Sequence, residues 1–211
     1  MKFEEIVHKI KQHKAYPEGK YRLFGLLIPI VCIENRWHIV FEVRAHTLRS
    51  QPGEICLPGG GIENNELPEE TAIRETCEEL NIRPEDIEII GATDYVVTPF
   101  NYALYPYMGI LNNFDPSYDG FNKDEVAEVF TVPLDYFINH RPDKYYVSSR
   151  FEFLDDFPFH KIQNGKDYNW KVGKYPILFY EYKHHVIWGM TARIIQNVVE
   201  ILEGKDHEWK E

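Results

Sequence analysis

The segment that most constrains the fold is a run of glycines followed by a strongly acidic stretch, between residues 59 and 82. Pro68 stands where the first turn of a helix tolerates a proline, because the missing N–H would have no helical partner there. Asn81 can adopt the left-handed conformation that ends a helix, and Pro84 prevents continuation. We therefore predict a helix that begins at Pro68, ends at Leu80 and is entered from a glycine turn.

One side of this predicted helix carries three carboxylates. At about 100° per residue, Glu75, Glu78 and Glu79 fall within roughly a 100° arc of the helix surface. Carboxylates this close repel one another strongly unless a cation lies among them. Ligands that offer only oxygen suit a hard divalent ion such as Mg²⁺ or Mn²⁺. Such an ion can bind a phosphate and activate a water molecule, so this segment points to phosphoryl chemistry.

The composition of the whole chain narrows the class of partner and compartment. The 211 residues suffice for one sizeable domain, and the net charge of −11 argues against nucleic acid or an acidic membrane surface as a partner. The start of the chain is charged and lacks the apolar core of a signal peptide, and the longest apolar runs are too short to span a bilayer. Three cysteines without metal or disulfide spacing indicate a reducing compartment, and we expect a cytoplasmic protein.

Hydrophobic periodicity and turn residues predict one α/β or α+β domain over residues 1–211. An amphipathic helix that ends before Pro17 forms an N-terminal extension, residues 1–19, and residues 140–175 form an irregular, loop-like insertion. A second long helix is expected over 189–203, and a short helical turn over 133–138. The remaining elements are predicted as strands or short extended segments over 21–33, 37–44, 86–97, 102–111, 124–132 and 177–182.

The acidic segment resembles the Nudix box of the hydrolases that act on diphosphates linked to a nucleoside. The matching pattern is Gly60, five residues, Glu66, seven residues, and then the run from Arg74 to Ile82. Two positions depart from the family, Thr76 in place of a bulky apolar residue and Asn81 in place of a glycine. A solvated acidic helix face is the alternative, but its i,i+4 pair of Arg74 and Glu78 stabilises a helix by only about 0.2–0.5 kcal/mol. That alternative leaves the other two carboxylates and the glycines unexplained.

This resemblance implies a fold, an activity and a set of roles. The fold is the Nudix fold, an α/β/α sandwich around a mixed β-sheet. Glu75, Glu78 and Glu79 are the implied metal ligands, helped by a backbone carbonyl of Gly59 or Gly60; Glu75 is alternatively the base that deprotonates the attacking water. Arg74 is implied to orient a glutamate. Glu66 is expected to hold the junction between loop and helix.

The segment before the box is similar to the signature of the coenzyme A diphosphatases, a Nudix subfamily. It contains Arg44, Arg49 and Gly53 at the spacing of that signature, followed by Pro-Gly-Gly. Leu57 replaces an aromatic residue of the signature, and Glu42 replaces a threonine upstream. The resemblance implies that the two arginines and Gly53 belong to the substrate site. Coenzyme A carries a diphosphate and a separate 3′-phosphate, and both are bound well by cationic groups held in fixed positions. The alternative interpretation is that Arg44 and Arg49 are ordinary surface arginines.

A second resemblance to the same subfamily lies near the C-terminus, where Trp188 to Ala192 reads Trp-Gly-Met-Thr-Ala. We interpret this segment as packing at the start of a helix and not as part of the catalysis.

Three further groups of residues were considered for function. Glu125 and Glu128 could add an outer metal ligand, although a solvated strand edge is favoured. His184 and His185 are interpreted as a surface turn. The aromatic residues of the insertion either shape a pantetheine groove or, as we favour, pin a long loop; they are Tyr145, Tyr146, Phe151, Phe153, Phe157 and Phe159.

Together these patterns predict a Mg²⁺- or Mn²⁺-dependent hydrolase that cleaves coenzyme A or acyl-coenzyme A to 3′,5′-ADP and (acyl-)4′-phosphopantetheine. The alternatives are a Nudix enzyme for ADP-ribose or NADH, and a non-catalytic nucleotide-sensing module on the same fold. A homodimer is possible, although no residue argues for it.

Overall fold

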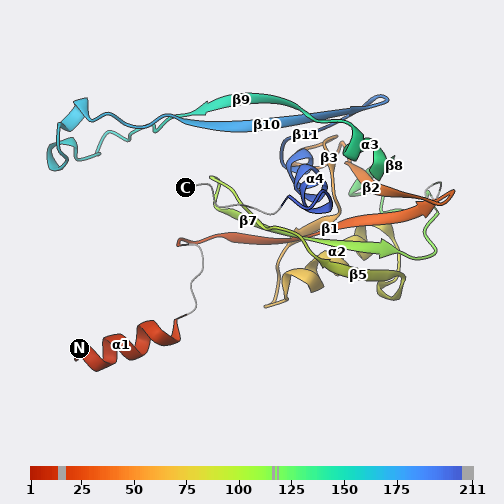
Figure 1. The fold of residues 1–211 in the computed structure, drawn as a ribbon, viewed down its shortest axis with the longest axis horizontal. Helices are drawn as coiled ribbons and strands as arrows, with labels where there is room; N and C mark the ends of the chain where they lie inside the picture. Colours follow the sequence, from red (N-terminus) through yellow and green to blue (C-terminus); the bar gives the residue numbers. More distant parts are fainter. Residues whose placement is uncertain (14–17, 116, 118, 206–211) are drawn as a thin grey trace.

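The structure is a computed structural model that describes residues 1–13, 18–115, 117 and 119–205. Its centre is a mixed sheet of eight strands, in which β3-β2-β1-β7-β5 form the main path (Figure 1). β4 pairs with β1, β6 with β7 and β8 with β2. The strands of this sheet are β1 (Arg22–Ile33), β2 (Arg36–Arg44), β3 (Ile55–Cys56), β4 (Gly59–Gly61), β5 (Ile87–Ala92), β6 (Val96–Val97), β7 (Tyr102–Leu111) and β8 (Val126–Pro133).

The first two strands, both predicted from the sequence, form a hairpin. Glu34 and Asn35 connect them with φ of 48° and 62°, and Ile33 pairs with Arg36. Two left-handed residues match the twist of the flanking strands, which explains the tight turn. β1 and β7 are parallel neighbours, whereas the other pairs of this sheet are antiparallel. The sheet is therefore mixed, as predicted.

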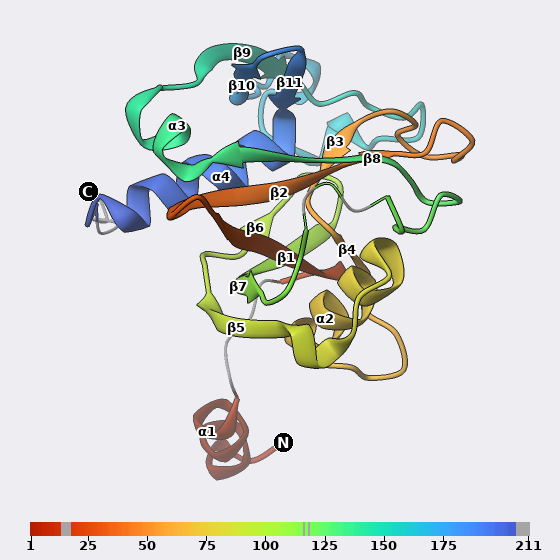
Figure 2. The ribbon, with the colours of Figure 1, turned by 90° about the vertical axis from the view of Figure 1, so that its right-hand side faces the viewer.

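Two long helices cover opposite faces of this sheet. α2 (Pro68–Leu80) lies on one face and α4 (Gly189–Leu202) on the other, as Figure 2 shows. Each helix has its own buried core: Ala72 and Leu80 pack with Leu27 and Val40 on the α2 side. The core on the α4 side is larger and includes Phe41. The α/β/α sandwich is confirmed.

Close contact between α2 and β1 depends on one glycine. A Cβ atom at Gly25 would lie 2.0 Å from the carbonyl oxygen of Pro68 and 2.9 Å from the backbone nitrogen of Ala72. Only glycine allows the helix backbone to approach the strand this closely. The helix begins at Pro68 and ends at Leu80, as predicted, and its C-cap Asn81 has left-handed φ of 54° and ψ of 43°.

The region predicted as an irregular insertion contains regular structure, so that prediction was wrong in part. β9 (Asp143–Ser149) pairs antiparallel with β10 (Gly173–Tyr182), and β11 (His185–Trp188) completes a second, three-stranded sheet. The ribbon of β9 and β10 extends beyond the main sheet (Figure 1). Every residue of β9 is exposed, so the strand lacks the apolar alternation by which a sequence reveals a strand.

The loop at the end of the ribbon, with the short 3₁₀ helices η2 (Phe159–Lys161) and η3 (Gly165–Asp167), is pinned by aromatic packing. Phe153 contacts Phe157, Phe159 and Trp170 with ring centroids 4.9–5.2 Å apart. This arrangement agrees with the interpretation that aromatic residues hold a long loop for Phe151, Phe153, Phe157 and Phe159, whereas Tyr145 and Tyr146 lie in β9.

Smaller differences concern the ends of elements. The strand predicted over 86–97 is two strands, β5 and β6, preceded by the 3₁₀ turn η1 (Pro84–Asp86). The break lies at residues 93–95, and within β5 the register on β7 shifts between Ile89 and Gly91. α3 (Leu134–Asn139) is the predicted short helix, and α1 (Phe3–Gln12) is the N-terminal helix, which buries none of its residues. Pro17, before which that helix was expected to end, lies outside the described residues.

Candidate active site

The candidate site lies where β4 meets α2. The Cβ atom of an alanine at Gly60 would lie 2.2 Å from Oε1 and 2.3 Å from Cδ of Glu75, so the Glu75 carboxylate rests directly on the glycine backbone. Burial raises the pKa of Glu75, although Arg74 opposes this shift. Gly60 therefore leaves the space that the Glu75 carboxylate, projecting from the helix, occupies.

Glu79 is the most deeply placed carboxylate of the helix, with only 5% of its surface exposed. The backbone N–H of Gly59 donates a hydrogen bond to its Oε2 over 2.9 Å. Burial raises the pKa of Glu79 to about 8, and the charges of Glu75 and Glu125 act in the same direction. A buried carboxyl group with this pKa holds a proton near neutrality unless a cation compensates its charge.

Arg74 ties three carboxylates together. Its Nε donates to Oε1 of Glu66 over 2.8 Å, and its Nη1 lies 2.9 Å from Oε1 of Glu75 and 3.2 Å from Oε2 of Glu78. Thr71 Oγ1 also donates to Glu66 over 2.9 Å. The hydrogen bonds from Arg74 and Thr71 lower the pKa of Glu66 to about 2. Glu66 thus joins the loop to the first turns of the helix, while Arg74 positions Glu75 and Glu78.

Sequence reasoning missed one member of this cluster, Glu42 on β2. Its side chain is 1% exposed and lies beside the carboxyl group of Glu79. Burial and the charge of Glu79 hold the pKa of Glu42 well above its usual range. Its Oε1 has no hydrogen-bond partner among the described residues. The available signal was a lone carboxylate in a strand whose neighbouring residues are apolar, which we had interpreted only as a departure from a motif.

The three residues predicted to bind substrate lie in and around the loop after β2. Arg44 is half-buried, donates from Nε to the carbonyl of Ser50 over 3.3 Å, and its charge acts on both Glu42 and Glu79. Gly53, with φ of 72°, donates its N–H to the carbonyl of Arg44 over 3.0 Å. Arg49 is exposed and makes no ion pair with the described residues. The loop therefore holds Arg44 beside the carboxylates and leaves Arg49 free to meet a ligand.

Glu125 and Glu128, considered together in the sequence, have different surroundings. The charge of Glu125 raises the pKa of Glu75 and Glu79, so Glu125 belongs to the electrostatic surroundings of the candidate site. Glu128 instead contacts a histidine, His185, with 3.0 Å between Oε1 and Nε2. Glu128 is therefore not a ligand of the box.

The interpretation of His184 and His185 as a surface turn was wrong for one of the two. His184 is exposed in the turn after β10, but His185 begins β11 and is 8% exposed. Its ring stacks on Phe130 with 3.6 Å between centroids. Strand pairing of His185 with Tyr182 draws the second histidine into the core, which no local pattern reveals.

The donor set around β4 fits a hard divalent ion. Every side chain in it offers carboxylate oxygen, Gly60 leaves room for one carboxylate, and Glu42 has a buried oxygen without a partner. In the structure the guanidinium of Arg74 occupies Glu75 and Glu78. Among the described residues, the cluster whose ligand atoms all lie within 4.8 Å of one another is Glu128, His184 and His185, and not the three glutamates of α2.

Comparison with known proteins identifies the family of this chain. The profile of the "NUDIX domain" family matches residues 28–157. The mouse protein "Peroxisomal coenzyme A diphosphatase NUDT7" is 34% identical over 85% of this chain and 70% of its own length. "Nudix hydrolase 3" of Caenorhabditis elegans is 28% identical over 84% of this chain and 72% of its own length. The chain belongs to the Nudix family and is a hydrolase of that class, whose members generally use divalent metal ions.

Among solved structures, a C. elegans Ap4A hydrolase aligns with a TM-score of 0.45 and 19% identity, over 53% of this chain and 80% of the other. No helix of the described residues is long and apolar enough to cross a membrane.

Proposed function

We propose that the chain hydrolyses the diphosphate of coenzyme A or an acyl-coenzyme A, with Mg²⁺ or Mn²⁺ bound, to 3′,5′-ADP and (acyl-)4′-phosphopantetheine. The observation that carries the hydrolytic part is the buried carboxylate of Glu79, fixed by the Gly59 N–H beside Glu75 and Glu42. The coenzyme A part is supported by the arginine loop and by the name of the mouse relative.

The carboxylates of α2 have distinct tasks in this proposal. Glu75, Glu78 and Glu79 would hold the metal ion, with the backbone of Gly59 and Gly60 at the same edge. When bound, the ion neutralises the diphosphate and lowers the pKa of a water molecule. Arg74 keeps Glu75 in place from the side, since its Nη1 reaches that carboxylate. Glu75 alternatively takes the proton of the attacking water, because it is only half-buried and remains accessible.

The substrate specificity is assigned to the loop after β2. Arg44 is placed at the carboxylate cluster and suits the diphosphate, whereas the exposed Arg49 suits a phosphate farther from the reacting bond. Gly53 shapes this loop, because its left-handed φ and its hydrogen bond to the Arg44 carbonyl fix the turn between the two arginines. The 3′-phosphate of coenzyme A is the group that distinguishes it from dephospho-coenzyme A.

A substrate panel tests the proposal. Initial rates with Mg²⁺ or Mn²⁺ are measured on coenzyme A, acetyl-coenzyme A, dephospho-coenzyme A, ADP-ribose and NADH. We expect the highest kcat/KM for coenzyme A or acetyl-coenzyme A. A higher value for ADP-ribose or NADH would replace the substrate assignment, and no turnover of any member would favour the sensing module.

Arg49→Ala sharpens the substrate test, because Arg49 makes no ion pair within the described part of the chain whose loss would disturb the fold. We expect a loss of about ten-fold in kcat/KM for coenzyme A, the scale of one charge-assisted contact, and little change for dephospho-coenzyme A. Arg36→Ala is the matched control, since Arg36 is exposed at the opposite end of β2. Equal effects of Arg49→Ala on both substrates would remove the 3′-phosphate assignment.

A cytoplasmic location and a possible homodimer stay predictions. The described cysteines are all free, as a reducing compartment requires, while the mouse relative carries a peroxisomal name. Fractionation of cells that express the chain and light scattering of the purified protein test these two points.

A further inference from the structure

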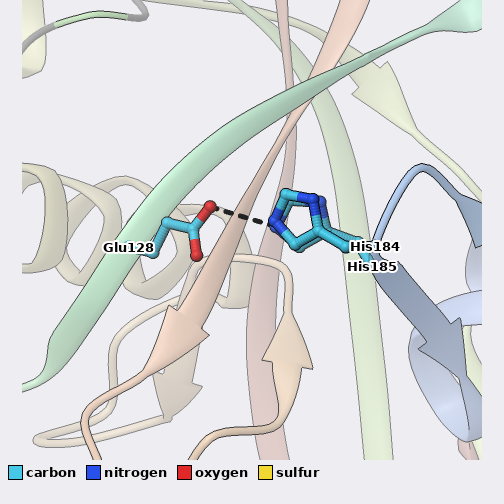
Figure 3. Close-up of side chains that lie close together, drawn as sticks. All are labelled: Glu128, His184 and His185. Carbon is cyan, nitrogen blue, oxygen red and sulfur yellow. Dashed lines mark hydrogen bonds and ion pairs between the residues drawn. The ribbon is translucent and has the colours of Figure 1, made fainter.

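A second cluster of potential metal ligands lies outside the glutamates of α2. Glu128 comes from β8, His184 from the turn between β10 and β11, and His185 from the first position of β11. Their ligand atoms all lie within 4.8 Å of one another. Figure 3 shows the two imidazole rings nearly on top of each other, with the carboxylate of Glu128 facing their edge. We propose that these three residues bind a late divalent transition-metal ion, and that Zn²⁺ fits the donor set best.

This cluster is separated from the candidate active site by the main sheet. Val43 pairs with Glu128, and Glu42 pairs with Val129. Side chains of successive residues point to opposite faces of a sheet, so Glu128 and Glu42 point away from each other. Glu42 meets Glu79 on the α2 side, whereas Glu128 shares its face with Phe130 and the core around α4. The proposed ion is therefore distinct from the catalytic one.

The donor types select the ion. Two imidazoles and one carboxylate suit Zn²⁺ and its neighbours in the first transition row, whereas Mg²⁺ prefers oxygen ligands alone. The 3.0 Å between Nε2 of His185 and Oε1 of Glu128 corresponds to an angle of about 94° at an ion that binds each atom at about 2.0–2.1 Å. A tetrahedral ion needs about 3.3 Å between its ligands, so this pair is almost in place.

The third ligand is brought in by the turn. Lys183 has φ of 56°, and this left-handed residue turns the chain so that the His184 ring lies over the His185 ring, with 4.0 Å between centroids and 37° between the ring planes. His184 is exposed, so its ring can rotate to complete the site without disturbing the core. His185 is held firmly between this ring and Phe130. His185 is thus a rigid ligand, whereas the exposed side chains of His184 and Glu128 can adjust, so that binding an ion would need little rearrangement of the fold.

The ion would join the two sheets. Glu128 belongs to the edge strand of the main sheet, and the histidines belong to the hairpin that carries the β9–β10 ribbon. Ligands that are 57 residues apart in sequence would be linked at the base of the ribbon. Binding to the folded chain alone stabilises it, so Zn²⁺ should raise the melting temperature.

Zn²⁺ titration of the full chain without an affinity tag tests the proposal. Millimolar Mg²⁺ is present throughout to occupy the oxygen site, and binding is followed by calorimetry and by NMR of the histidine ring nitrogens. We expect one Zn²⁺ per chain, shifted ring resonances of His184 and His185, and a higher melting temperature. His184→Ala and Glu128→Gln should each weaken binding at least about ten-fold and abolish the thermal shift.

Both substitutions leave the core intact, because His184 and Glu128 are exposed and a glutamine at 128 can still accept a hydrogen bond from His185. His160→Ala is the matched control, since His160 is exposed in η2, and it should bind Zn²⁺ as the parent does. Equal Zn²⁺ affinity of the parent and His184→Ala, or unshifted ring resonances, would overturn the proposal. Glu79→Gln should keep the Zn²⁺ site even where it abolishes hydrolysis, and loss of Zn²⁺ binding in that variant would also overturn it.

Discussion

Replacement of Gly60 by alanine separates the chemistry of the candidate site from the stability of the fold. The new Cβ would lie 2.2 Å from Oε1 of Glu75, so the carboxylate must retreat by about 1 Å to reach an ordinary contact distance. Gly60 itself is not in the left-handed region, so an alanine fits its backbone without strain. The perturbation therefore acts almost entirely on the position of one carboxylate.

The magnitudes follow from this geometry. A displacement of about 1 Å in a group that positions reacting atoms costs about 100-fold in rate, or about 2.7 kcal/mol of transition-state stabilisation. The fold loses much less, because the displaced atoms end a flexible side chain. The broken contact with Arg74 is partly exposed and contributes at most about 1 kcal/mol. For a domain of this size that corresponds to about 2–4 °C in melting temperature.

The assay combines kcat/KM on the best substrate of the panel with thermal unfolding of the same samples. Gly61→Ala is the matched control, because its Cβ would meet only the flexible end of Arg22 at 3.3 Å. We expect Gly61→Ala to keep activity within about three-fold and Gly60→Ala to lose about 100-fold. If Gly60→Ala kept activity within about three-fold of the parent at an unchanged melting temperature, Glu75 could not be a working group resting on this glycine.

The remaining predictions concern Glu79 and the end of α2. Burial raises the folded-state pKa of Glu79 to about 8, above that of an unfolded glutamate, so the metal-free protein should lose stability as pH rises from about 5 to about 8 and then level off. Chemical denaturation across this range should show a flatter pH dependence for Glu79→Gln, and added Mg²⁺ should restore stability at pH 8. An equal slope in both proteins would contradict this reasoning. The charged groups that act on this carboxyl are Glu42, Glu75, Glu125 and Arg44. Asn81→Ala should lower the free energy of unfolding by about 1–2 kcal/mol, because alanine is strained in the left-handed conformation and cannot make the 2.8 Å hydrogen bond to the Gly120 carbonyl. Asn81→Gly should lower it less, because glycine adopts this conformation without strain. Urea denaturation of the two variants measures the difference.

The elements that could be predicted from the sequence are those with local signals. Pro68 and Asn81 mark both ends of α2 within the chain itself, and the left-handed pair Glu34 and Asn35 marks the first hairpin. The arrangement of the glutamates on one helix face follows from the same local periodicity. β9 could not be found in this way, because a strand exposed on both faces has no alternation of apolar and polar residues.

The positions of Glu42 and His185 could not be predicted because they depend on pairings between distant segments. Residues 39–42 of β2 are all buried, since α2 covers one face of the strand and the core around α4 covers the other. A carboxylate in such a strand needs a polar partner on the face to which it points, and the register of the strand decides which face that is. A slip of β8 by one residue along β2 would turn Glu128 towards the apolar core under α2, and a slip of β2 by one residue would remove Glu42 from Glu79. Both charged groups therefore disfavour the alternative register, and the same pairing that places a carboxylate in the candidate active site places Glu128 beside the histidines on the opposite face.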